Sequence, residues 1–517
     1  FFFVILFCSC LAHSHATAMS IIALVTRILG SRWAVATSLV GSLVYWLVRP
    51  AFRLRHLPWV PRTSLLGGNL DELVAKGPLR CYQDWSSASD GVVVARSGRQ
   101  TFVLLTDQAL IKDVLDGINV YSGREIVVSL PFRPPENLLW AKGARWKALR
   151  SATNPAFRRQ LIHPFMPLMS DCANKLVELI DAAITERNGR LDIHESLQHM
   201  ALDVIGSAAF GQRLNRLGGE TCEVSQAAAQ LLVGQALGAQ TWRTQFLTSL
   251  VQLPVTIILA VQKALGIRSQ LSDALDVLNE TCRRSLQENA AETSLLTLMK
   301  EAVDPDTNAK LTEEQMLANS RLFLLAGHET TAKTMAFAIY YVALNPQVQE
   351  KIHAELDAGP AEMTKETIAS FKYLDHVINE TMRMQAVAPV ITRSPVVDAR
   401  LGPYNIPAGT PIVIPANVIH HNPKLWGSDA DEFRPERFEG FEATGADRFK
   451  FLPFGGGPRK CIGYHFALLE MKVTLARLLR KFHFDVDRSK TSVPMQTFFW
   501  IVVHPVGGVN VIATPRH

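Results

Sequence analysis

The feature that most constrains the fold is a proline-free segment long enough to cross a whole domain as one helix. It begins with Thr312-Glu-Glu-Gln315, a capping box in which the Thr and Gln side chains satisfy free backbone N–H groups. The next proline is Pro346. An interval of about 32 residues predicts a helix of roughly 48 Å at about 1.5 Å per residue. We therefore expect one large domain with this helix at its centre.

The rest of the chain predicts mainly α structure with small β-sheets at one side. From about Lys142 to Pro346 the pattern is mostly helical, with Phe165–Arg187 and Glu195–Phe210 as examples. Gly91–Leu105 alternates β-branched and polar residues, which predicts a short hairpin. Extended segments are expected again towards the end of the chain, at Thr392–Val397, Pro411–Pro415 and Phe498–Ala513.

Composition narrows the class of protein. Hydrophobic residues make up 48% of the 517 residues and charged residues 19%, which is a globular composition. The net charge of +6 is not gathered into Lys/Arg clusters interleaved with aromatic residues, so no nucleic-acid partner is expected. The seven cysteines are odd in number and form no C-x-x-C motif, which argues against a disulfide framework or a zinc ribbon. We expect reduced, mostly buried cysteines and a catalytic part that faces the cytosol.

Residues 1–49 predict a membrane anchor. Phe1–Thr26 contains no Asp, Glu, Lys or Arg, and a second apolar stretch follows at Trp33–Val48. The first stretch is long enough to span a bilayer, whereas the second, of about 16 residues, is marginal. If translation began at Met19, the second stretch would be the main anchor. The basic cluster after Val48 would keep the next domain on the cytosolic side. A cleaved signal peptide and a buried core helix are the alternative interpretations.

Residues 50–68 predict a stiff connector between the anchor and a catalytic domain at residues 69–517. His56–Gly68 contains two prolines and two glycines, which disfavour a helix. The connector would set the angle between the anchor and the domain.

The strongest chemical signal is Phe454-Gly-Gly-Gly-Pro-Arg-Lys-Cys-Ile-Gly463. A lone cysteine is most often a small core residue, but three glycines let this backbone approach a flat object closely. Apolar Met471–Leu479 indicates that a helix begins just after Cys461, and a helix N-terminus stabilises a thiolate. Gly463 removes a side chain where that helix must pass the cofactor, and Arg459 supplies a cation for an acidic periphery. The segment predicts a thiolate ligand to iron.

This segment resembles the haem-binding loop of the cytochrome P-450 family, F-x-x-G-x-R-x-C-x-G, and every fixed position from Phe454 to Gly463 is filled. Other signatures of that family follow in the right order and cover roughly Leu57 to the C-terminus. The resemblance implies the cytochrome P-450 fold, with the long central helix over the haem. It also implies haem b with an axial thiolate from Cys461. A related class of fatty-acid hydroxylases attaches its haem through a Glu at the position of Ala326, so here we expect a non-covalent porphyrin.

A second signature lies midway along the long helix, where Ala326-Gly-His-Glu-Thr-Thr331 is similar to the family's A-G-x-E-T-T. A Thr inside a helix can donate to the carbonyl four residues earlier, here that of Ala326, and locally open the helix. The resemblance implies that Gly327 leaves room for dioxygen, that Thr330 binds the oxygen, and that Glu329 relays protons from solvent. A surface Thr/Glu pair is the alternative interpretation.

Two further segments carry charges that the family uses to brace the cysteine loop. Glu380-Thr-Met-Arg383 resembles E-x-x-R, and residues at i and i+3 share a helix face, so a salt bridge is expected. Phe433–Phe438 contains P-E-R-F. The resemblance implies that Arg437 joins Glu380 and Arg383 in a buried network with a structural role.

A fourth signature, Trp146-Lys-Ala-Leu-Arg150, is similar to the family's W-x-x-x-R. The i, i+4 spacing points both side chains the same way, so the indole N–H and the guanidinium can bind one haem propionate. Arg393 falls where the family has another propionate-binding arginine. A solvated strand residue is the alternative for Arg393.

The resemblance implies a monooxygenase that inserts one oxygen atom of dioxygen into an apolar organic substrate, with hydroxylation as the expected outcome. Electrons would come from NADPH through NADPH–cytochrome P-450 reductase, with cytochrome b5 as a further candidate donor. The expected location is the endoplasmic reticulum membrane. A haem-thiolate isomerase or dehydratase, and a non-catalytic haem carrier or sensor, are the alternatives. The intact pair Glu329 and Thr330 speaks against both.

The pocket that the resemblance implies is mostly apolar, which fits a fatty acid, sterol, terpenoid or aromatic substrate. Its expected lining is Val128–Phe132, Phe323, Ala326, Val387–Pro389 and Phe498–Phe499.

Overall fold

The structure is a computed structural model that describes most of the chain between residues 51 and 516. The residues within that range that it does not describe are 65–66, 99, 125–136, 212–213, 215–216, 218–222, 225, 228–269, 288–293, 302, 304–309, 443 and 500. The predicted anchor at residues 1–49 therefore lies outside the described residues. Among the helices that are described, none has the length and apolar character needed to cross a bilayer.

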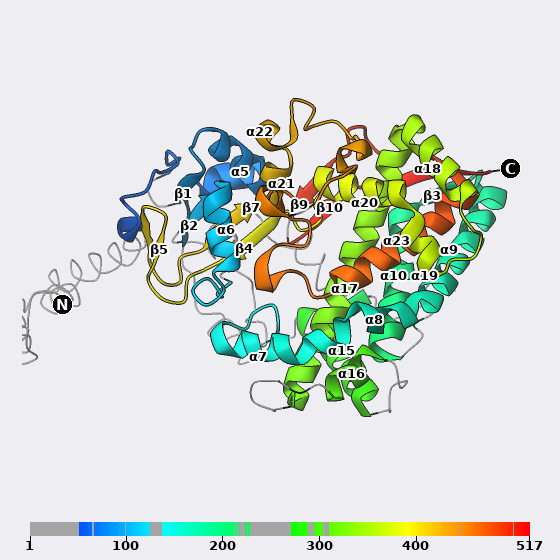
Figure 1. The fold of residues 1–517 in the computed structure, drawn as a ribbon, viewed down its shortest axis with the longest axis horizontal. Helices are drawn as coiled ribbons and strands as arrows, with labels where there is room; N and C mark the ends of the chain where they lie inside the picture. The colour runs from blue at the N-terminus through cyan, green and yellow to red at the C-terminus, as the bar shows by residue number, and fades with distance from the viewer. Residues whose placement is uncertain are drawn as a thin grey trace, which may run out of the picture.

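The long helix expected from the sequence is α17, Glu313–Leu344, with 32 residues. Its capping box is complete: the N–H of Gln315 donates to Oγ1 of Thr312 over 3.2 Å, and the N–H of Thr312 donates to Oε1 of Gln315 over 2.9 Å. Helices α10, α20 and α23 pack around it in the helical part of the molecule (Figure 1). The prediction of a central helix in a mainly α fold is confirmed.

The other helices form a bundle around α17 and a smaller group beside the main sheet. Helix α10 begins where the Asp192 carboxylate accepts from the N–H of His194 over 3.0 Å, and it ends at Gly211 with φ 68°. The bundle contains α7 (Gly143–Thr153), α8 (Arg159–Ile162), α9 (Met166–Arg187), α10 (Ile193–Phe210), α15 (Gln270–Gln287), α16 (Leu295–Glu301), α18 (Pro346–Ala358), α19 (Lys365–Ser370), α20 (Lys372–Met384) and α23 (Tyr464–Lys481). The smaller group contains α4 (Leu70–Lys76), α5 (Pro78–Ser87), α6 (Gln108–Asp116), α21 (Ala416–His420) and α22 (Pro423–Trp426).

The main sheet lies at the left of Figure 1, on the opposite side of the molecule from α9 and α18. Its strand order is β1-β2-β7-β4, and the predicted hairpin is confirmed as the antiparallel pair β1 and β2. Strand β2 pairs in parallel with β7, and β7 pairs antiparallel with β4. The strands are β1 (Val92–Ser97), β2 (Gln100–Leu105), β4 (Val390–Arg393) and β7 (Ile412–Pro415). A separate hairpin joins β5 (Ala399–Leu401) and β6 (Tyr404–Ile406).

Two predicted extended segments are shorter than expected. The segment predicted at Thr392–Val397 leaves the sheet after Arg393, because Pro395 has no N–H to continue the ladder. The apolar stretch Phe498–Ala513 is divided among three strands, since Gly507 and Gly508 turn the chain with φ of 75° and 78°. These strands are β9 (Thr497–Phe499) and β10 (Val503–Pro505), which form a hairpin, and β11 (Asn510–Pro515).

Strand β11 lies between two partners that are far apart in the sequence. It pairs antiparallel with β3 (Arg190–Asp192) on one side and with β8 (Phe482–Val486) on the other. The sheet therefore ties the start of α10 to the end of α23, and so holds two of the helices that surround α17.

Candidate active site

The cysteine loop is held in a tight conformation by its glycines. Gly455 and Gly457 have φ of 72° and 67°. A Cβ on Gly457 would lie 1.9 Å from the carbonyl oxygen of Leu115, so this loop rests directly on the end of α6. The N–H of Cys461 donates to the carbonyl of Phe454 over 2.9 Å and closes the loop. Helix α23 then begins at Tyr464, which agrees with the helix predicted just after the cysteine.

The thiol of Cys461 differs in its surroundings from the other described cysteines. The residue is accessible, unlike the buried thiols of Cys81, Cys172 and Cys282, yet protein surrounds it closely enough to desolvate it. This burial raises the pKa of Cys461. The N–H of Gly463 and the charges of nearby basic side chains act in the opposite direction. In the protein alone, burial outweighs the stabilisation expected from the helix N-terminus.

Four arginines gather at the cysteine loop, and the charges of Arg124, Arg150 and Arg459 each lower the pKa of at least one neighbour in the group. Burial is the main cause for each, and it lowers the pKa of Arg124 to about 10 and that of Arg459 to about 9. The pKa of Arg150 is also lowered, and that of Arg393 falls well below its ordinary value. No carboxylate in the described part of the chain forms a salt bridge with any of these four arginines. Cations gathered in this way call for a carboxylate partner that the described residues do not supply.

Hydrogen bonds from these arginines hold the cysteine loop but leave some donors free. Arg393 donates to the carbonyl of Gly456 over 3.3 Å, and Arg459 donates to the carbonyl of Ala141. The buried Nε atoms of Arg124, Arg393 and Arg459 have no partner among the described residues. These orphaned donors fit the two carboxylates of a haem, so the donor set suits the group that the cysteine loop predicts.

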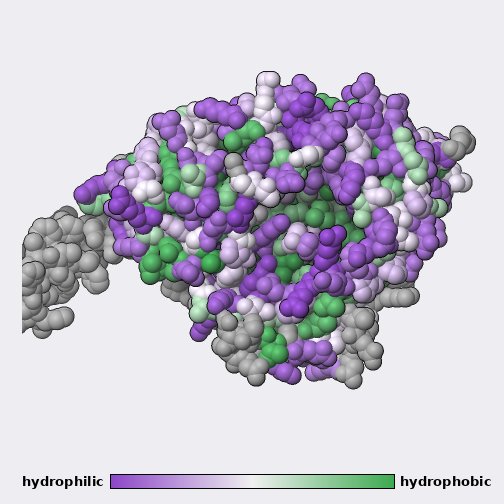
Figure 2. All heavy atoms as spheres, in the orientation of Figure 1, coloured by the Kyte–Doolittle hydropathy of each residue, from purple (hydrophilic) through white to green (hydrophobic). Residues whose placement is uncertain are grey.

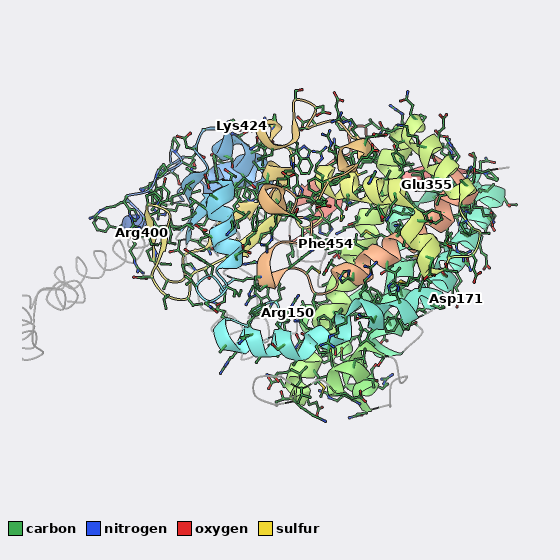
Figure 3. All side chains as sticks on the ribbon, viewed as in Figure 1. Arg150, Asp171, Glu355, Arg400, Lys424 and Phe454 are labelled. Carbon is green, nitrogen blue, oxygen red and sulfur yellow. The ribbon has the colours of Figure 1, made fainter. Side chains whose placement is uncertain are left out.

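The two residues of the W-x-x-x-R signature lie on α7. Trp146 is buried, and the guanidinium of Arg459 stacks on its ring at 4.6 Å from the centroid. Arg150 lies one turn later, close enough for its charge to act on Cys461. Figure 3 shows Arg150 on α7 and Phe454 near the centre of the molecule, on the loop that leads to the cysteine.

The oxygen-activating segment lies at the middle of α17. Ala326 is exposed although most of the helix around it is buried, which is expected for a residue that borders a cavity. Oγ1 of Thr330 donates to the carbonyl of Ala326 over 2.7 Å, as predicted. Thr331 makes the same bond to Gly327 over 3.0 Å. The helix nevertheless continues without interruption, so the expected local opening is wrong for this structure.

Gly327 has a packing role that the sequence did not reveal. A Cβ at this position would lie 3.0 Å from Cγ1 of Ile205, which belongs to α10. The absent side chain therefore permits the close contact of α17 with α10, the helix that it contacts most extensively.

Glu329 is buried and paired with a cation that was not anticipated. Its Oε1 lies 2.6 Å from Nζ of Lys333, one turn further along α17. The same Nζ lies 2.8 Å from Nδ1 of His504, on β10. The structure encloses Glu329 in an ion pair, and its expected role as a proton relay stays a prediction.

The structure brings Glu380, Arg383 and Arg437 together in a buried network. Arg383 donates to both oxygens of Glu380 over 2.7 Å and 2.8 Å, and Arg437 donates to Oε1 over 3.0 Å. Glu380 and Arg383 are fully buried. The expected i, i+3 salt bridge is therefore present, and a partner 57 residues away joins it.

A single histidine connects this network to the cysteine loop. Arg383 donates to the backbone carbonyl of His420 over 2.7 Å. The ring Nε2 of His420 accepts from the N–H of Leu452 over 2.9 Å, and Leu452 in turn accepts from Gly455 over 3.0 Å. The network thus reaches the first glycine of the loop through two hydrogen bonds at His420.

The residues expected to line the substrate pocket are only partly described. Phe323 is buried against Phe157, with ring centroids 5.0 Å apart. Val387 accepts from the N–H of Val503 over 2.8 Å, so the segment after α20 lies beside the hairpin that carries Phe498. The expected lining at residues 128–132 lies outside the described residues.

A pocket of ≈ 470 Å³ opens beside the cysteine loop. Its lining combines aromatic rings, among them Phe451, Phe454 and Tyr464, with the basic residues Arg448 and Lys460. Figure 2 shows hydrophobic side chains in a hollow near the middle of the visible face, surrounded by hydrophilic ones.

The sequence analysis missed three residues near the site, and two of them could not have been found from the sequence. Arg124 stands in no recognisable motif, and His504 lies in an apolar strand 171 residues from the lysine that it contacts. Lys333 could have been suspected, because residues at i and i+4 on a helix face the same way and Glu329 is four residues earlier.

Comparisons with known proteins find the same family over nearly the whole described chain. Residues 59–510 match the family model described as Cytochrome P450. The chain is similar to Cytochrome P450 6a8 of Drosophila melanogaster, with 30% identity over 492 residues that cover 89% of this chain and 94% of the relative. It is 28% identical to Cytochrome P450 3A28 of Bos taurus, over 81% of this chain and 83% of that protein. It is 29% identical to Cytokinin hydroxylase of Arabidopsis thaliana, over 84% and 83%.

Proposed function

Because the chain belongs to the cytochrome P450 family and is a monooxygenase of that family, we propose that it inserts one oxygen atom of dioxygen into an apolar organic substrate. The observation that carries the proposal is an accessible thiol beside four arginines with no acidic partner in the described chain. A haem-thiolate group would satisfy both features at once. Hydroxylation is the expected reaction.

The proposed cofactor is haem b, which the thiolate of Cys461 would hold and which would have no other covalent bond to the protein. The propionates would be bound by the four arginines Arg124, Arg150, Arg393 and Arg459. The ring of Trp146, stacked against the guanidinium of Arg459, would help to hold that arginine in position. When bound, the haem would supply the reductive splitting of dioxygen. Ala326 cannot form the ester that a Glu at that position would form, which supports non-covalent binding.

Two residues of α17 would manage protons during the reaction. Oγ1 of Thr330 donates its own hydrogen to the carbonyl of Ala326, so its lone pairs remain free to accept. Such a hydroxyl can donate its hydrogen to the helix backbone and still accept a hydrogen bond from a water molecule, which would deliver a proton beside Thr330. The carboxylate of Glu329, on the adjacent residue, would carry protons to that water.

The substrate is proposed to be apolar because the described part of the expected pocket is apolar. Phe323, Val387 and Phe499 are apolar residues of the expected lining. Ala326, which is exposed, is a further apolar residue of that lining. A lipid, sterol, terpenoid or aromatic compound matches such a lining.

The proposed electron source is NADPH, delivered through NADPH–cytochrome P450 reductase, with cytochrome b5 as a second donor. Arg448 and Lys460 at the pocket beside the cysteine loop support docking of an acidic partner. We also propose the arrangement expected from the sequence: an anchor at residues 1–49, a connector at 50–68, and a catalytic domain at 69–517 on the cytosolic side of the endoplasmic reticulum.

The test is reconstitution with the reductase and a lipid library, comparing Thr330→Ala with the parent protein. We expect haem and substrate binding to remain, NADPH to be consumed, less product per NADPH and more hydrogen peroxide. The loss should lie within the roughly 10²–10⁴-fold range of a positioned proton donor. Thr334→Ala is the matched control, because Thr334 makes the same back-bond one turn further along, to Thr330 over 2.8 Å.

The two alternative functions give different results in the same experiment. An isomerase or dehydratase would form product without NADPH, and a haem carrier would consume none. Unchanged product per NADPH in Thr330→Ala, for a well-coupled substrate, would show that Thr330 does not manage the proton.

A further inference from the structure

Helix α17 carries a buried ion pair directly beside the oxygen-activating segment. Glu329 and Lys333 are four residues apart and so share one helix face. Nζ lies 2.6 Å from Oε1, and the two side chains are 0% and 3% exposed for Lys333 and Glu329 respectively. A charge pair this deeply buried needs further partners, because desolvation opposes it.

The further partner is His504, from strand β10. Its Nδ1 lies 2.8 Å from Nζ of Lys333 and 3.7 Å from Oε1 of Glu329. Its ring stacks on Phe498 across the hairpin, with centroids 4.7 Å apart and planes 9° from parallel. The ammonium group is therefore held between a carboxylate on α17 and an imidazole on the hairpin.

The charges around this cluster are limited to the ion pair near neutral pH. Burial lowers the pKa of His504 to about 4 and, together with the charge of Lys333, that of His194 to about 3. Burial also lowers the pKa of His328. These three histidines, on β10, α10 and α17, are the other titratable groups that interact with the pair in the described chain. A neutral His504 can accept a hydrogen bond from the ammonium group.

Both interactions on the carboxylate use Oε1. The ammonium group stabilises the ionised carboxylate and fixes its rotamer. A carboxylate fixed in this way takes up a proton only when Nζ releases it. Movement of the hairpin would loosen Nζ, since His504 is the second group that holds it.

We propose that Lys333 and His504 are positioning residues that clamp Glu329, keeping its carboxylate ionised and limiting the proton supply to Thr330 until the β9–β10 hairpin moves. This inference rests on the proposed role of Glu329 in proton transfer. Phe498 belongs to the expected wall of the substrate pocket and stacks on His504. A substrate that contacts Phe498 could therefore change the position of His504 and, through Lys333, the proton supply to Thr330.

The first test does not depend on turnover. In Lys333→Met the carboxyl group of Glu329 loses its cation and should become protonated near neutral pH. Infrared spectroscopy of the holoenzyme should then show an additional protonated-carboxyl band. That band should be absent from the double variant Lys333→Met/Glu329→Gln, which leaves no unpaired charge. A single variant without the additional band would overturn the clamp.

The second test measures NADPH consumption with the reductase and no added substrate, across about pH 6 to pH 7.5, because burial lowers the pKa of Lys333 to about 8 and the parent keeps its ion pair below that pH. Lys333→Met should consume NADPH several-fold faster than the parent at the acid end, where the unpaired carboxyl group binds a proton most readily, and the difference should shrink as the pH rises. His504→Phe, which keeps the ring stack on Phe498, should change the rate in the same direction by less.

Lys472→Met is the matched control. Lys472 is also buried and ion-paired, with Nζ 2.6 Å from Asp375, but it lies on α23 and contacts neither Glu329 nor the hairpin. This variant should keep the parent's pH profile. If Lys333→Met loses haem, His504→Phe still decides the question.

The remaining outcomes separate the inference from the function on which it rests. If Glu329→Gln consumed NADPH faster than the parent protein, or at the same rate, Glu329 would not be a proton carrier. The proposed clamp would then be wrong as well. Slower NADPH use in Glu329→Gln, combined with a parent-like pH profile in both Lys333→Met and His504→Phe, would overturn the clamp alone.

Discussion

Cys461 is the residue on which the chemistry of the site depends. It lies between the loop glycines and the N-terminus of α23, with the N–H of Gly463 directed to its sulfur. Cys461→Ser should abolish the thiolate-type absorption spectrum of the reduced carbon-monoxide complex, because a serine oxygen donates far less electron density. A variant that kept the parent spectrum would disprove the assignment of the axial ligand.

His420 should make the stability of the protein sensitive to acid. Burial lowers its pKa from 6.5 to about 3, so the folded protein keeps this ring neutral while the unfolded chain takes up a proton. Above about pH 6.5 this difference does not affect the free energy of unfolding, which decreases as the pH falls from there towards 3. By pH 5 the decrease is about 2 kcal/mol. His420→Gln, whose amide oxygen can still accept from Leu452, should show a smaller fall in the urea midpoint between pH 7 and pH 5. An equal fall in both proteins would rule His420 out as the cause.

At the scale of elements, the charge network fastens α20 to residues 420–437. Arg437→Ala removes a partner of a fully buried carboxylate, which typically costs about 3–5 kcal/mol, so the variant should fail to retain haem. Arg434→Ala is the control, because the side chain of Arg434 is 53% exposed in its salt bridge with Asp429. Haem content after purification is the measurement. Fully haem-loaded Arg437→Ala protein would mean that the network is not required by the cysteine loop.

The elements that the sequence predicts well are those whose cause is local. The capping box at Thr312 and the absence of proline before Pro346 determine α17, and the alternation of Gly91–Leu105 determines the first hairpin. Prediction failed where one residue ends a pattern, as Pro395 does after β4. It also failed at contacts between distant segments, such as Lys333 with His504, since no local pattern encodes a meeting of residues 171 positions apart.

The same distinction applies to the candidate site. The motifs identified Cys461, Thr330 and Glu380 by their spacing, and the structure adds which groups surround them. Arg124 is an example, because its role follows only from its closeness to Arg150 and Arg459.

At the scale of the whole molecule, the attachment to membrane is expected to reside in residues 1–49. Deleting them should release most of the protein into the soluble fraction, because the charge-free stretch and its basic flank are then removed. Sedimentation of full-length and truncated protein with membranes is the measurement. Equal sedimentation would indicate that another apolar surface anchors the domain.

The position of β11 also bears on how the protein is made in the cell. This strand is the middle one of its sheet, so β3 and β8 gain their shared neighbour only after residues 510–515 have left the ribosome. Until then the edge of β3 that will pair with β11 is unpaired, for more than half of the time that synthesis of the chain takes. Open strand edges invite pairing with other chains. We therefore expect the nascent polypeptide to need protection of this edge during synthesis, and the sheet that joins α10 to α23 to form among the last steps.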